Sequence, residues 1–544
     1  MAERKLLSGN EALALGALHA GVNLGVGYPG TPSTEILENL DLLGAHAQWS
    51  PNEKVAAEVA LGVAYAGGRT LVTMKHVGMN VAADVIYTTA YSGVQGGYVV
   101  ACADDPGMAS SQNEQDSRRH AHAAGIPLLE PSDSQECYDM VRLAFELSER
   151  WEVPVIMRLT TRVCHSCSSV VPREVLSSKE GRYEKMAKRR VMIPAHARPA
   201  HHELRRKLNE IRAWNESDEG PCLEIEGKSE LAVITSGINF QHVREAFPEA
   251  SVLKLGMSHP FPESRVKAFM EKHPNSRVVE ENDPYLFEQI SAAGLSVPKT
   301  PEAFRFSEFN VNRVRSLINT GEDVKEIVVK GKPPQLCTSC PHRSTFQILK
   351  DKDCIVAGDI GCYTLAVLPP LEAMDTQNCM GASIGVGLGM RHVLPEDQAR
   401  RVVSVIGDST FIHSGMTGIA EMVYSTPKTG HVVVILDNST TAMTGLQEHP
   451  ATGRSLNHER SHKVELEAVC RGLGVDRVEV IHPGREKDRF FTLLDEALQS
   501  NGTTVIIARQ ACVLAAPKIR KYEQQIEAEQ CCCVEEATEK EVTR

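Results

Sequence analysis

The stretch VVSVIGDSTFIHSG (402–415) decides the fold. Its apolar run stops at Gly407 and Asp408, small polar residues follow, and GMTGIAEMVY (415–424) has helical spacing. A second apolar run, HVVVILDNSTTAMTG (431–445), ends in the same way at Asp437 and Asn438. Two apolar strands joined by a helix are typical of a parallel sheet. Ligands of such sheets bind beyond the carboxyl ends of the strands, which is where Asp408 and Asn438 are expected.

The residue types at these two strand ends point to a metal ion and a phosphate. One carboxylate, one side-chain amide oxygen and one or two backbone carbonyls suit Mg²⁺, which completes its octahedron with phosphate oxygens and water. The small residues after Asp408 open a helix, whose first N–H groups can meet phosphate oxygens. An ordinary strand end would explain Gly407-Asp408 alone. The second polar strand end, at Asn438, favours a diphosphate–Mg²⁺ site.

Strands alternate with helices along most of the chain, which predicts an α/β fold with parallel sheets and helices on both faces. We expect an α/β domain over residues 1–180, then a charged segment of helices and linker, without a strand, over 181–228. A smaller α/β domain, with SVLKLGM as one of its strands, is expected over 229–330. A third α/β domain is expected over 331–516, and the tail 517–544 should be helical at first and then disordered.

Composition and charge exclude several classes of function. The 544 residues carry a formal net charge of −12, which argues against a nucleic-acid-binding protein and against a basic membrane-surface protein. The sequence has no apolar run of membrane-spanning length. Its first residues, MAERKLLSGNEALALGAL, include acids and lack the apolar core and cleavage site of a signal peptide. We therefore expect a cytoplasmic protein.

Longer motifs carry a resemblance to a known family. GDST and LDNSTTAMTG resemble the thiamine-diphosphate motif, which begins with Gly-Asp-Gly/Ser and ends at an Asn one helix later. Further segments are similar to the α subunits of indolepyruvate:ferredoxin oxidoreductases: GNEALALGALHAGVNLGVGYPGTPSTEI, WSPNEKVAAEVALGVAYAG, CTSCPHRSTF and GDIGCYTLAVLPPLEAMDTQNCMGASIGVG. These enzymes belong to the thiamine-diphosphate-dependent 2-oxoacid:ferredoxin oxidoreductases. The resemblance implies a pyrimidine-binding and a diphosphate-binding domain, both doubly wound parallel sheets, flanking a smaller domain like the C-terminal domain of transketolase.

The resemblance assigns the diphosphate end of the cofactor to the third domain. Asp408 and Asn438 would bind Mg²⁺ through their side chains, and Thr440 would do so through its carbonyl oxygen. The residues expected around the diphosphate and the thiazolium are Gly407, Ser409, Met380, Gly381, Ala382 and Ser383.

In the first domain the resemblance implies two catalytic residues. Glu53 matches the glutamate that meets the pyrimidine N1′, and Thr31 matches a threonine that meets the keto-acid substrate. Glu58, on the same helix as Glu53, is the rival and is expected to be buried or at an interface. Thr31 could instead be a capping hydroxyl before a helix. Lys75 and His76 follow a strand and could meet a carboxylate or the thiamine, or be structural.

The cysteines divide into groups. The order of Cys337, Cys340, Cys362 and Cys512 resembles the four ligands of the family's proximal [4Fe–4S] cluster, which requires four thiolates from loops. The Cys-x-x-Cys pair alone could equally hold zinc or form a redox disulfide. Lone cysteines are expected to be small buried apolar residues, namely Cys102, Cys137, Cys222, Cys354 and Cys470. The pair Cys164 and Cys167 is expected to be a surface thiol pair.

The sequence departs from this family at two places. Indolepyruvate oxidoreductase α subunits usually end in a ferredoxin-like domain with two Cys-x-x-Cys-x-x-Cys-x-x-x-Cys runs, which this sequence lacks. The adjacent Cys531, Cys532 and Cys533 cannot replace them, because neighbouring thiols cannot span the corners of a cubane. In TTAMTGLQEHPATG, Leu446 and Glu448 stand where the family usually has His and Pro. This difference bears on substrate preference or proton handling.

The resemblance predicts oxidative decarboxylation of an aryl 2-oxoacid, such as indolepyruvate, with coenzyme A. The products would be acyl-CoA and CO₂, and electrons would leave through a [4Fe–4S] cluster to ferredoxin or another carrier. Expected cofactors are thiamine diphosphate, Mg²⁺ and the cluster. The expected partner subunit is a smaller β subunit (γ-type), and the expected assembly is α2β2. The alternatives are a non-oxidative thiamine-dependent decarboxylase or carboligase, and a non-enzymatic paralogue, against which Asp408, Asn438 and Glu53 argue.

Overall fold

A computed structural model describes residues 4–323, 335–522 and 524 of the chain. The chain divides into two units, Met1–Val328 and Val329–Arg544, which are described separately below. The expected domain boundaries at residues 180, 228, 330 and 516 stay predictions. Cys531, Cys532 and Cys533 lie outside the described residues.

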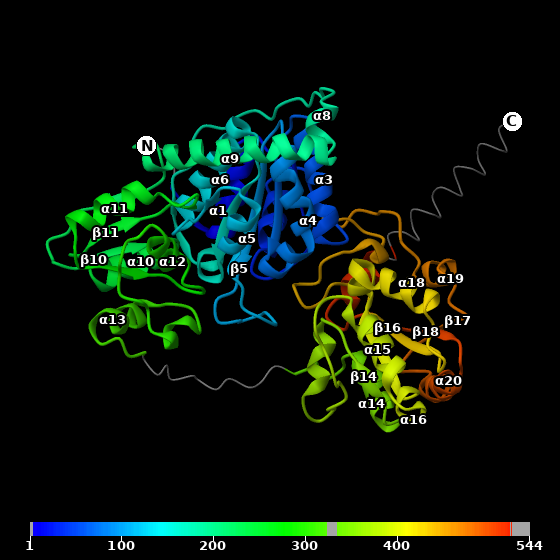
Figure 1. Ribbon diagram of the computed structural model, residues 1–544. Coiled ribbons are helices and arrows are strands. Elements are labelled where there is room, and N and C mark those ends of the chain that lie inside the picture. The colour runs from blue at the N-terminus through cyan, green and yellow to red at the C-terminus, as the bar shows by residue number, and fades with distance from the viewer. Residues whose placement is uncertain (1–3, 324–334, 523, 525–544) are drawn as a thin grey trace. The chain divides into compact units, whose positions relative to one another are not determined.

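The first unit is built on a seven-stranded sheet with the order β12-β6-β7-β5-β4-β2-β3, in which only β12 is antiparallel to its neighbour (Figure 1). Every residue of β4, β5 and β7 is buried, as expected for strands covered on both faces. The strands are β2 (Leu24–Gly27), β3 (Ala47–Trp49), β4 (Thr70–Lys75), β5 (Tyr98–Asp104), β6 (Leu128–Leu129), β7 (Val155–Thr160) and β12 (Met257–His259).

Two groups of helices pack on this sheet. One group holds α1 (Gly9–His19), α2 (Thr34–Leu42) and α6 (Ser134–Trp151), and α1 contacts both of the others. The other group is centred on α4 (His76–Ser92), which contacts α3 (Glu53–Tyr65), α5 (Ser117–Ala124) and α9 (Pro194–Glu216). The short α7 (Thr161–His165) and α8 (Ala187–Arg190) connect elements, and β1 (Lys5–Ser8) pairs antiparallel with β8 (Cys167–Val170).

A smaller four-stranded sheet completes the first unit, with the order β13-β10-β11-β9. Its strands are β9 (Leu223–Ile225), β10 (Ala232–Thr235), β11 (Ser251–Lys254) and β13 (Ser276–Val279). Its helices are α10 (Asn239–Ala246), α11 (Glu263–Lys272), α12 (Tyr285–Ala292), η1 (Glu302–Arg305) and α13 (Val311–Asn319). The predicted single strand SVLKLGM is wrong, because the chain leaves this sheet after Lys254 and Met257 begins β12 in the larger sheet.

The charged segment 181–228 also differs from its prediction. It ends in a strand, β9, which pairs antiparallel with β11 although two of its three residues are exposed. Its long helix α9 packs on α4. Trp214 of α9 meets Trp151 of α6 edge to face, with ring centroids 5.5 Å apart. The segment is therefore part of the first unit's packing and not only a connection.

The second unit is a five-stranded, fully parallel sheet with the order β14-β15-β16-β18-β17. Its strands are β14 (Ile355–Ala357), β15 (Val402–Gly407), β16 (His431–Asp437), β17 (Arg477–Ile481) and β18 (Thr503–Arg509). The helices are α14 (His342–Asp351), η2 (Cys362–Val367), α15 (Ala382–Val393), α16 (Glu396–Ala399), α17 (Asp408–Thr410), η3 (Phe411–Gly415), α18 (Met416–Tyr424), η4 (Pro450–Thr452), α19 (Leu466–Gly472) and α20 (Lys487–Gln499). Residues 516–522 are also helical.

Alternation along the central strand β16 explains the two layers of helices. Val432, Val434 and Leu436 belong to an apolar cluster with side chains of α14 and α20. Val433 and Ile435 belong to a second cluster, with side chains of α15, α18 and α19. Successive side chains of a strand point to opposite faces, so a continuous apolar run needs helices on both sides. The predicted α/β class with doubly wound parallel sheets is confirmed.

None of the helices in the described parts of the chain combines the length and apolar character needed to cross a bilayer.

Candidate functional site

The two polar strand ends that opened the sequence analysis meet in the second unit. Asp408 follows β15, Asn438 follows β16, and the two strands are parallel neighbours. The carboxylate of Asp408 accepts a hydrogen bond from Ser409 N through Oδ1 (2.9 Å) and from Ser439 N through Oδ2 (2.8 Å). Ser439 has a φ of +59°, so the second loop adopts an unusual backbone to reach Asp408. Both Asp408 and Asn438 are buried.

The side-chain amide of Asn438 has a fixed orientation. Its Nδ2 donates to His342 Nε2 at 3.2 Å, and its Oδ1 accepts from Thr440 N at 3.1 Å. Burial lowers the pKa of His342 to about 4, against a smaller opposing effect of Asp408, so the ring is neutral and can accept this hydrogen bond. The amide oxygen of Asn438 therefore stays on the side of Thr440, with a lone pair left for a cation.

The loop after β14 supports both the Asp408 loop and the start of α15. Tyr363 Oη accepts from Gly407 N at 2.9 Å and donates to Ile360 O at 3.0 Å. The buried Asp359 accepts from Gly381 N (2.9 Å) and Ser383 N (3.0 Å). Burial raises the pKa of Asp359, and these backbone N–H groups oppose the rise. Two residues predicted to surround the diphosphate and the thiazolium thus have their backbone N–H groups bonded to a carboxylate.

Glycine is required at residue 381. Its φ is +84°, and an added Cβ would lie 2.5 Å from Cβ of Ser414. The Met380–Ser383 turn therefore packs directly on η3, the irregular π-helical stretch that follows Asp408 and Thr410. Single π-turns inside helices occur often at functional sites.

These residues fit a Mg²⁺ ion. The donor set of one carboxylate, one amide oxygen and the Thr440 carbonyl is the kind that this ion binds together with phosphate. The buried His449 indicates a further ligand beside the same carboxylate: its Nε2 stands 3.4 Å from Asp408 Oδ2, and neither ring nitrogen makes a hydrogen bond within the described protein. Buried nitrogens in native proteins normally have a partner, so this site has polar groups prepared for a further ligand.

The four cysteines of the predicted cluster lie near one another in the same unit. The pKa of the Cys362 thiol is raised to about 11, chiefly by burial and with smaller contributions from the neighbouring thiols of Cys340, Cys512 and Cys337. Burial likewise raises the pKa of Cys340, again with contributions from Cys337 and Cys512. The turn that carries Cys337 and Cys340 is held by Arg343, whose Nε donates to Cys337 O at 2.8 Å. Cys340 and Cys362 thus each lie within electrostatic range of the other three thiols.

The first unit gathers a second set of predicted residues at the carboxyl ends of adjacent strands. Thr31, Glu53 and Lys75 follow or end β2, β3 and β4. Lys75 Nζ donates to Ser110 O at 3.0 Å, and Ser110 Oγ lies 3.4 Å from Thr31 O. Burial lowers the pKa of Lys75, while the charges of Asp105 and Glu53 act in the opposite direction.

The capping alternative for Thr31 is not what the structure has. The N-cap residue of α2 is Ser33, not Thr31. The loop before the helix is closed by Thr34 Oγ1, which accepts from Gly30 N at 3.0 Å, and by Ser33 Oγ, which donates to Gly30 O at 2.8 Å. Thr31 itself is partly exposed. Its neighbour Lys75 packs against Gly30, since a Cβ on that glycine would lie 3.3 Å from Lys75 Cγ.

Glu53 and Glu58 differ in burial, and for Glu58 the burial is not the expected one. Glu53 is the first residue of α3 and is 5% exposed, whereas Glu58 is exposed and pairs with Lys54. The expectation that Glu58 is buried is wrong within this chain, because its position on α3 faces solvent. The alternative that it lies at an interface stays a prediction. Gly78 of α4 packs on Glu53: an added Cβ would lie 2.5 Å from its Oε1 and 2.7 Å from its Cγ.

Comparisons with known proteins agree with both units. The family described as pyruvate flavodoxin/ferredoxin oxidoreductase, thiamine diphosphate-binding, matches residues 15–213, and the C-terminal binding domain of thiamine pyrophosphate enzymes matches residues 359–508. The chain is 39% identical to the indolepyruvate oxidoreductase subunit IorA of Archaeoglobus fulgidus, over 96% of this chain and 89% of that relative. This chain belongs to the IorA family. The corresponding subunit of Thermococcus kodakarensis is 38% identical over 94% of this chain and 86% of that relative.

A solved structure shares the fold of this IorA-family chain. The 2-oxoglutarate:ferredoxin oxidoreductase from Magnetococcus marinus, with 2-oxoglutarate, coenzyme A and succinyl-CoA bound, superposes with a TM-score of 0.50. The match covers 59% of this chain and 65% of that chain at 16% identity, so it supports the fold alone. Thr31 and Glu53 lie within the first matched family range, and Asp408 and Asn438 lie within the second.

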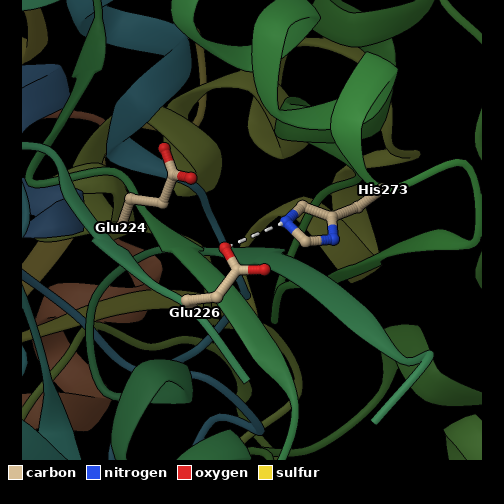
Figure 2. A group of neighbouring side chains, drawn as sticks. All are labelled: Glu224, Glu226 and His273. Carbon is tan, nitrogen blue, oxygen red and sulfur yellow. Dashed lines mark ion pairs between the residues drawn. The ribbon is translucent and has the colours of Figure 1, made fainter. Parts of the chain in front are cut away.

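The predicted thiol pair, the five lone cysteines and one surface cluster of this IorA-family chain do not join either site. Cys164 is buried and only Cys167 is exposed, so the predicted surface thiol pair is wrong. Cys102, Cys137 and Cys470 are buried as expected, while Cys222 and Cys354 are partly buried. Figure 2 shows Glu224 of β9 and Glu226, just after it, close to His273 at the end of α11. Lys272 already pairs with both carboxylates, so their charge is compensated without a metal.

Sequence reasoning missed four site residues: His342, Asp359, Tyr363 and His449. A signal existed for Asp359, because CIVAGDI ends in the same Gly-Asp pair as the strand before Asp408. His342 and His449 had no local signal, since their partners lie 96 and 41 positions away along the chain. The role of Tyr363, a hydroxyl under the Gly407 backbone, is equally non-local.

Proposed function

We propose that this chain is the thiamine-diphosphate-binding subunit of a 2-oxoacid:ferredoxin oxidoreductase that acts on an aryl 2-oxoacid of the indolepyruvate kind. The overall reaction converts the 2-oxoacid anion, coenzyme A and two oxidised ferredoxins into acyl-CoA, CO₂, two reduced ferredoxins and one proton. The observation that carries this proposal is the presence, in one unit, of the Asp408–Asn438 strand ends together with four clustered cysteines.

Asp408, Asn438 and the Thr440 carbonyl are proposed to hold Mg²⁺ against the cofactor's diphosphate. When bound, thiamine diphosphate supplies a carbon nucleophile and an electron sink for decarboxylation. The residues Gly407, Ser409 and Met380–Ser383 form the proposed wall around it. Because Gly381 N and Ser383 N are bonded to Asp359, the contribution of this turn is its shape and its close approach, not those two N–H groups.

In the first unit, Glu53 is proposed to hold a proton opposite the pyrimidine N1′. Its burial at the start of α3, with Gly78 against its carboxylate, fixes the side chain and keeps water away. Thr31 is proposed to orient the substrate keto-acid. Lys75, a buried cation near Glu53, is a second group that could attract the substrate carboxylate.

Cys337, Cys340, Cys362 and Cys512 are proposed to bind a [4Fe–4S] cluster as four thiolates. The raised pKa values of Cys340 and Cys362 describe the protein without iron, in which four thiolates would repel one another. Iron would offset that repulsion and remove the protons, as bound metal ions do for coordinating thiols.

The proposed partners follow from the subunit character of the family. They are a smaller β subunit, in an α2β2 assembly, and ferredoxin or another carrier that accepts the electrons. A cytoplasmic location remains our prediction from the sequence.

Anaerobic purification of the chain with its smaller subunit tests this function. We expect about four irons and four acid-labile sulfides per chain, and reduction of ferredoxin that depends on both indolepyruvate and coenzyme A. Iron-free protein that is fully active in releasing CO₂ would instead establish the non-oxidative decarboxylase or carboligase. Iron bound without any activity on aryl 2-oxoacids would contradict the substrate class.

A further inference from the structure

The segment after β18 runs along the loop that follows β16. We call residues 510–522 the C-terminal strap and residues 438–458 the magnesium loop. At the first contact the backbones are directly bonded: Gln510 N donates to Asp437 O and Cys512 N donates to Asn438 O, both at 2.9 Å. A proposed Mg²⁺ ligand and a proposed cluster ligand are thus joined by one backbone hydrogen bond.

A second, apolar contact follows along the strap. Cys512, Ala515 and Ile519 are buried and form a small cluster with Ala442 and Leu446 of the magnesium loop. Leu446 has a φ of +72°, a conformation that is unfavourable for a non-glycine residue. The contacts of Leu446 with the strap stabilise this backbone conformation.

A third contact closes the far end of the strap. Lys518 Nζ lies 2.7 Å from His458 Nε2, and the ring of Tyr522 stacks on His458 with centroids 5.7 Å apart. The Arg454 guanidinium lies 4.9 Å from the centre of the Tyr522 ring. Behind this layer the buried Glu448 carboxylate lies 3.2 Å from Arg454 Nε and 3.1 Å from His458 Nδ1. Charge, stacking and hydrogen bonding thus tie the end of the loop to the strap.

We propose that the C-terminal strap couples the two cofactor sites, so that binding of Mg²⁺ with thiamine diphosphate and assembly of the iron–sulfur cluster strengthen each other. This inference rests on the proposed function. Asn438 cannot shift without pulling the backbone of Cys512, and Leu446 and His458 hold the same two segments in register. A ligand that fixes the magnesium loop therefore also fixes Cys512, and linkage makes the effect reciprocal.

The first test measures the affinity of full-length chain for thiamine diphosphate at saturating Mg²⁺ by calorimetry, with and without the cluster. We expect the iron-loaded protein to bind at least about fivefold more tightly, the lower end of usual coupling factors. The double variant Lys518→Met/Tyr522→Leu removes the third contact and keeps the backbone bond of Cys512, so it should lower that ratio measurably below the wild-type value while iron still binds. The matched control is Arg520→Met, an exposed residue on the same helical stretch, which should keep the wild-type ratio.

The second test uses iron-free protein and reads out thiol accessibility. Mg²⁺ with thiamine diphosphate should slow alkylation of the buried Cys512, followed by peptide mass spectrometry, at least about fivefold. Cys337, which is exposed and lies outside the strap, serves as the internal reference and should change less. In the double variant the protection of Cys512 should be weaker than in wild type.

The outcomes separate this inference from the function on which it rests. Wild-type protein that holds no iron would overturn both the proposed cluster and the coupling. Bound iron with an affinity ratio of one, or an unchanged Cys512 alkylation rate, would overturn the coupling alone. A strap that was only structural would lower the thermal stability of the double variant but leave the affinity ratio at its wild-type value.

Discussion

Asp408 has a structural role and a proposed metal-binding role. Its carboxylate ties Ser409 and Ser439 together, and it is the only full negative charge that we assign to Mg²⁺. Asp408→Ala should weaken Mg²⁺-dependent binding of thiamine diphosphate at least about 100-fold, equal to roughly 2.8 kcal/mol, as measured by calorimetry. Asp397→Ala, at an exposed position of α16, is the control and should bind as wild type. Unchanged affinity in Asp408→Ala would remove this residue from the site.

Glu53 is predicted to act on a proton and not on binding. Glu53→Gln keeps the size of the side chain but cannot hold a proton in the same way, so the cofactor should still bind. Exchange of the thiazolium C2 proton for deuterium, followed by NMR, should slow by roughly 10²–10⁴, the usual range of general acid–base catalysis. Glu58→Gln, on the solvent face of the same helix, should exchange normally. Normal exchange in Glu53→Gln would rule out this role.

The sequence predicted Asp408 from its strand end and Glu53 from its match to the family's motif. It had no signal for His342, and for Asp359 it offered the Gly-Asp pair but not the contacts, which only the fold creates. His342 fixes the Asn438 amide from 96 positions away, and Asp359 bonds to the N–H groups of a turn 22 to 24 positions later. These contacts of His342 and Asp359 produce no periodic pattern in the sequence.

Among the elements, the central strands were predictable and the edge strands β3, β9 and β17 were not. β5, β15 and β16 are largely apolar and fully buried, since both faces of these strands are covered. β3, β9 and β17 lie at sheet edges, are short and are partly exposed, so they lack a long apolar run. The exchange of sheets between β11 and β12 within SVLKLGM had no sequence signal, because both halves are buried.

The contact between α3 and α4 gives a prediction about elements. Gly78 of α4 leaves room for the Glu53 side chain, and a methyl group there would meet Oε1, Cγ and Cδ. Gly78→Ala should therefore displace Glu53 and slow C2 proton exchange by up to about 100-fold, the cost of a small misplacement, while circular dichroism stays that of wild type. Gly62→Ala on α3 is the matched control, because its Cβ would enter open space. That variant should gain about 0.5–1 kcal/mol in unfolding free energy and exchange normally.

Within the first unit, buried ion pairs join the larger sheet to the smaller one. Arg118 of α5 pairs with Asp116 at 2.6 Å and with Glu280, just after β13, at 3.0 Å, and all three side chains are buried. Arg158 of β7 extends the network to Asp104 and Glu130, both at 2.6 Å. Removing one partner of a buried pair leaves the other charge uncompensated, so this network should decide the stability of the whole unit.

Arg118→Met tests that statement, because methionine fills similar space without the charge. The unfolding free energy of the first unit should fall by about 3–5 kcal/mol, the usual cost of breaking a buried pair. All three tryptophans, Trp49, Trp151 and Trp214, lie in this unit, so urea unfolding followed by tryptophan fluorescence reports on it alone. Arg119→Met is the adjacent control: its side chain is 40% exposed, its partners are Asp283 and Glu288, and its loss should cost no more than about 1 kcal/mol. Equal effects of the two variants would show that burial of the network contributes nothing to holding the two sheets together.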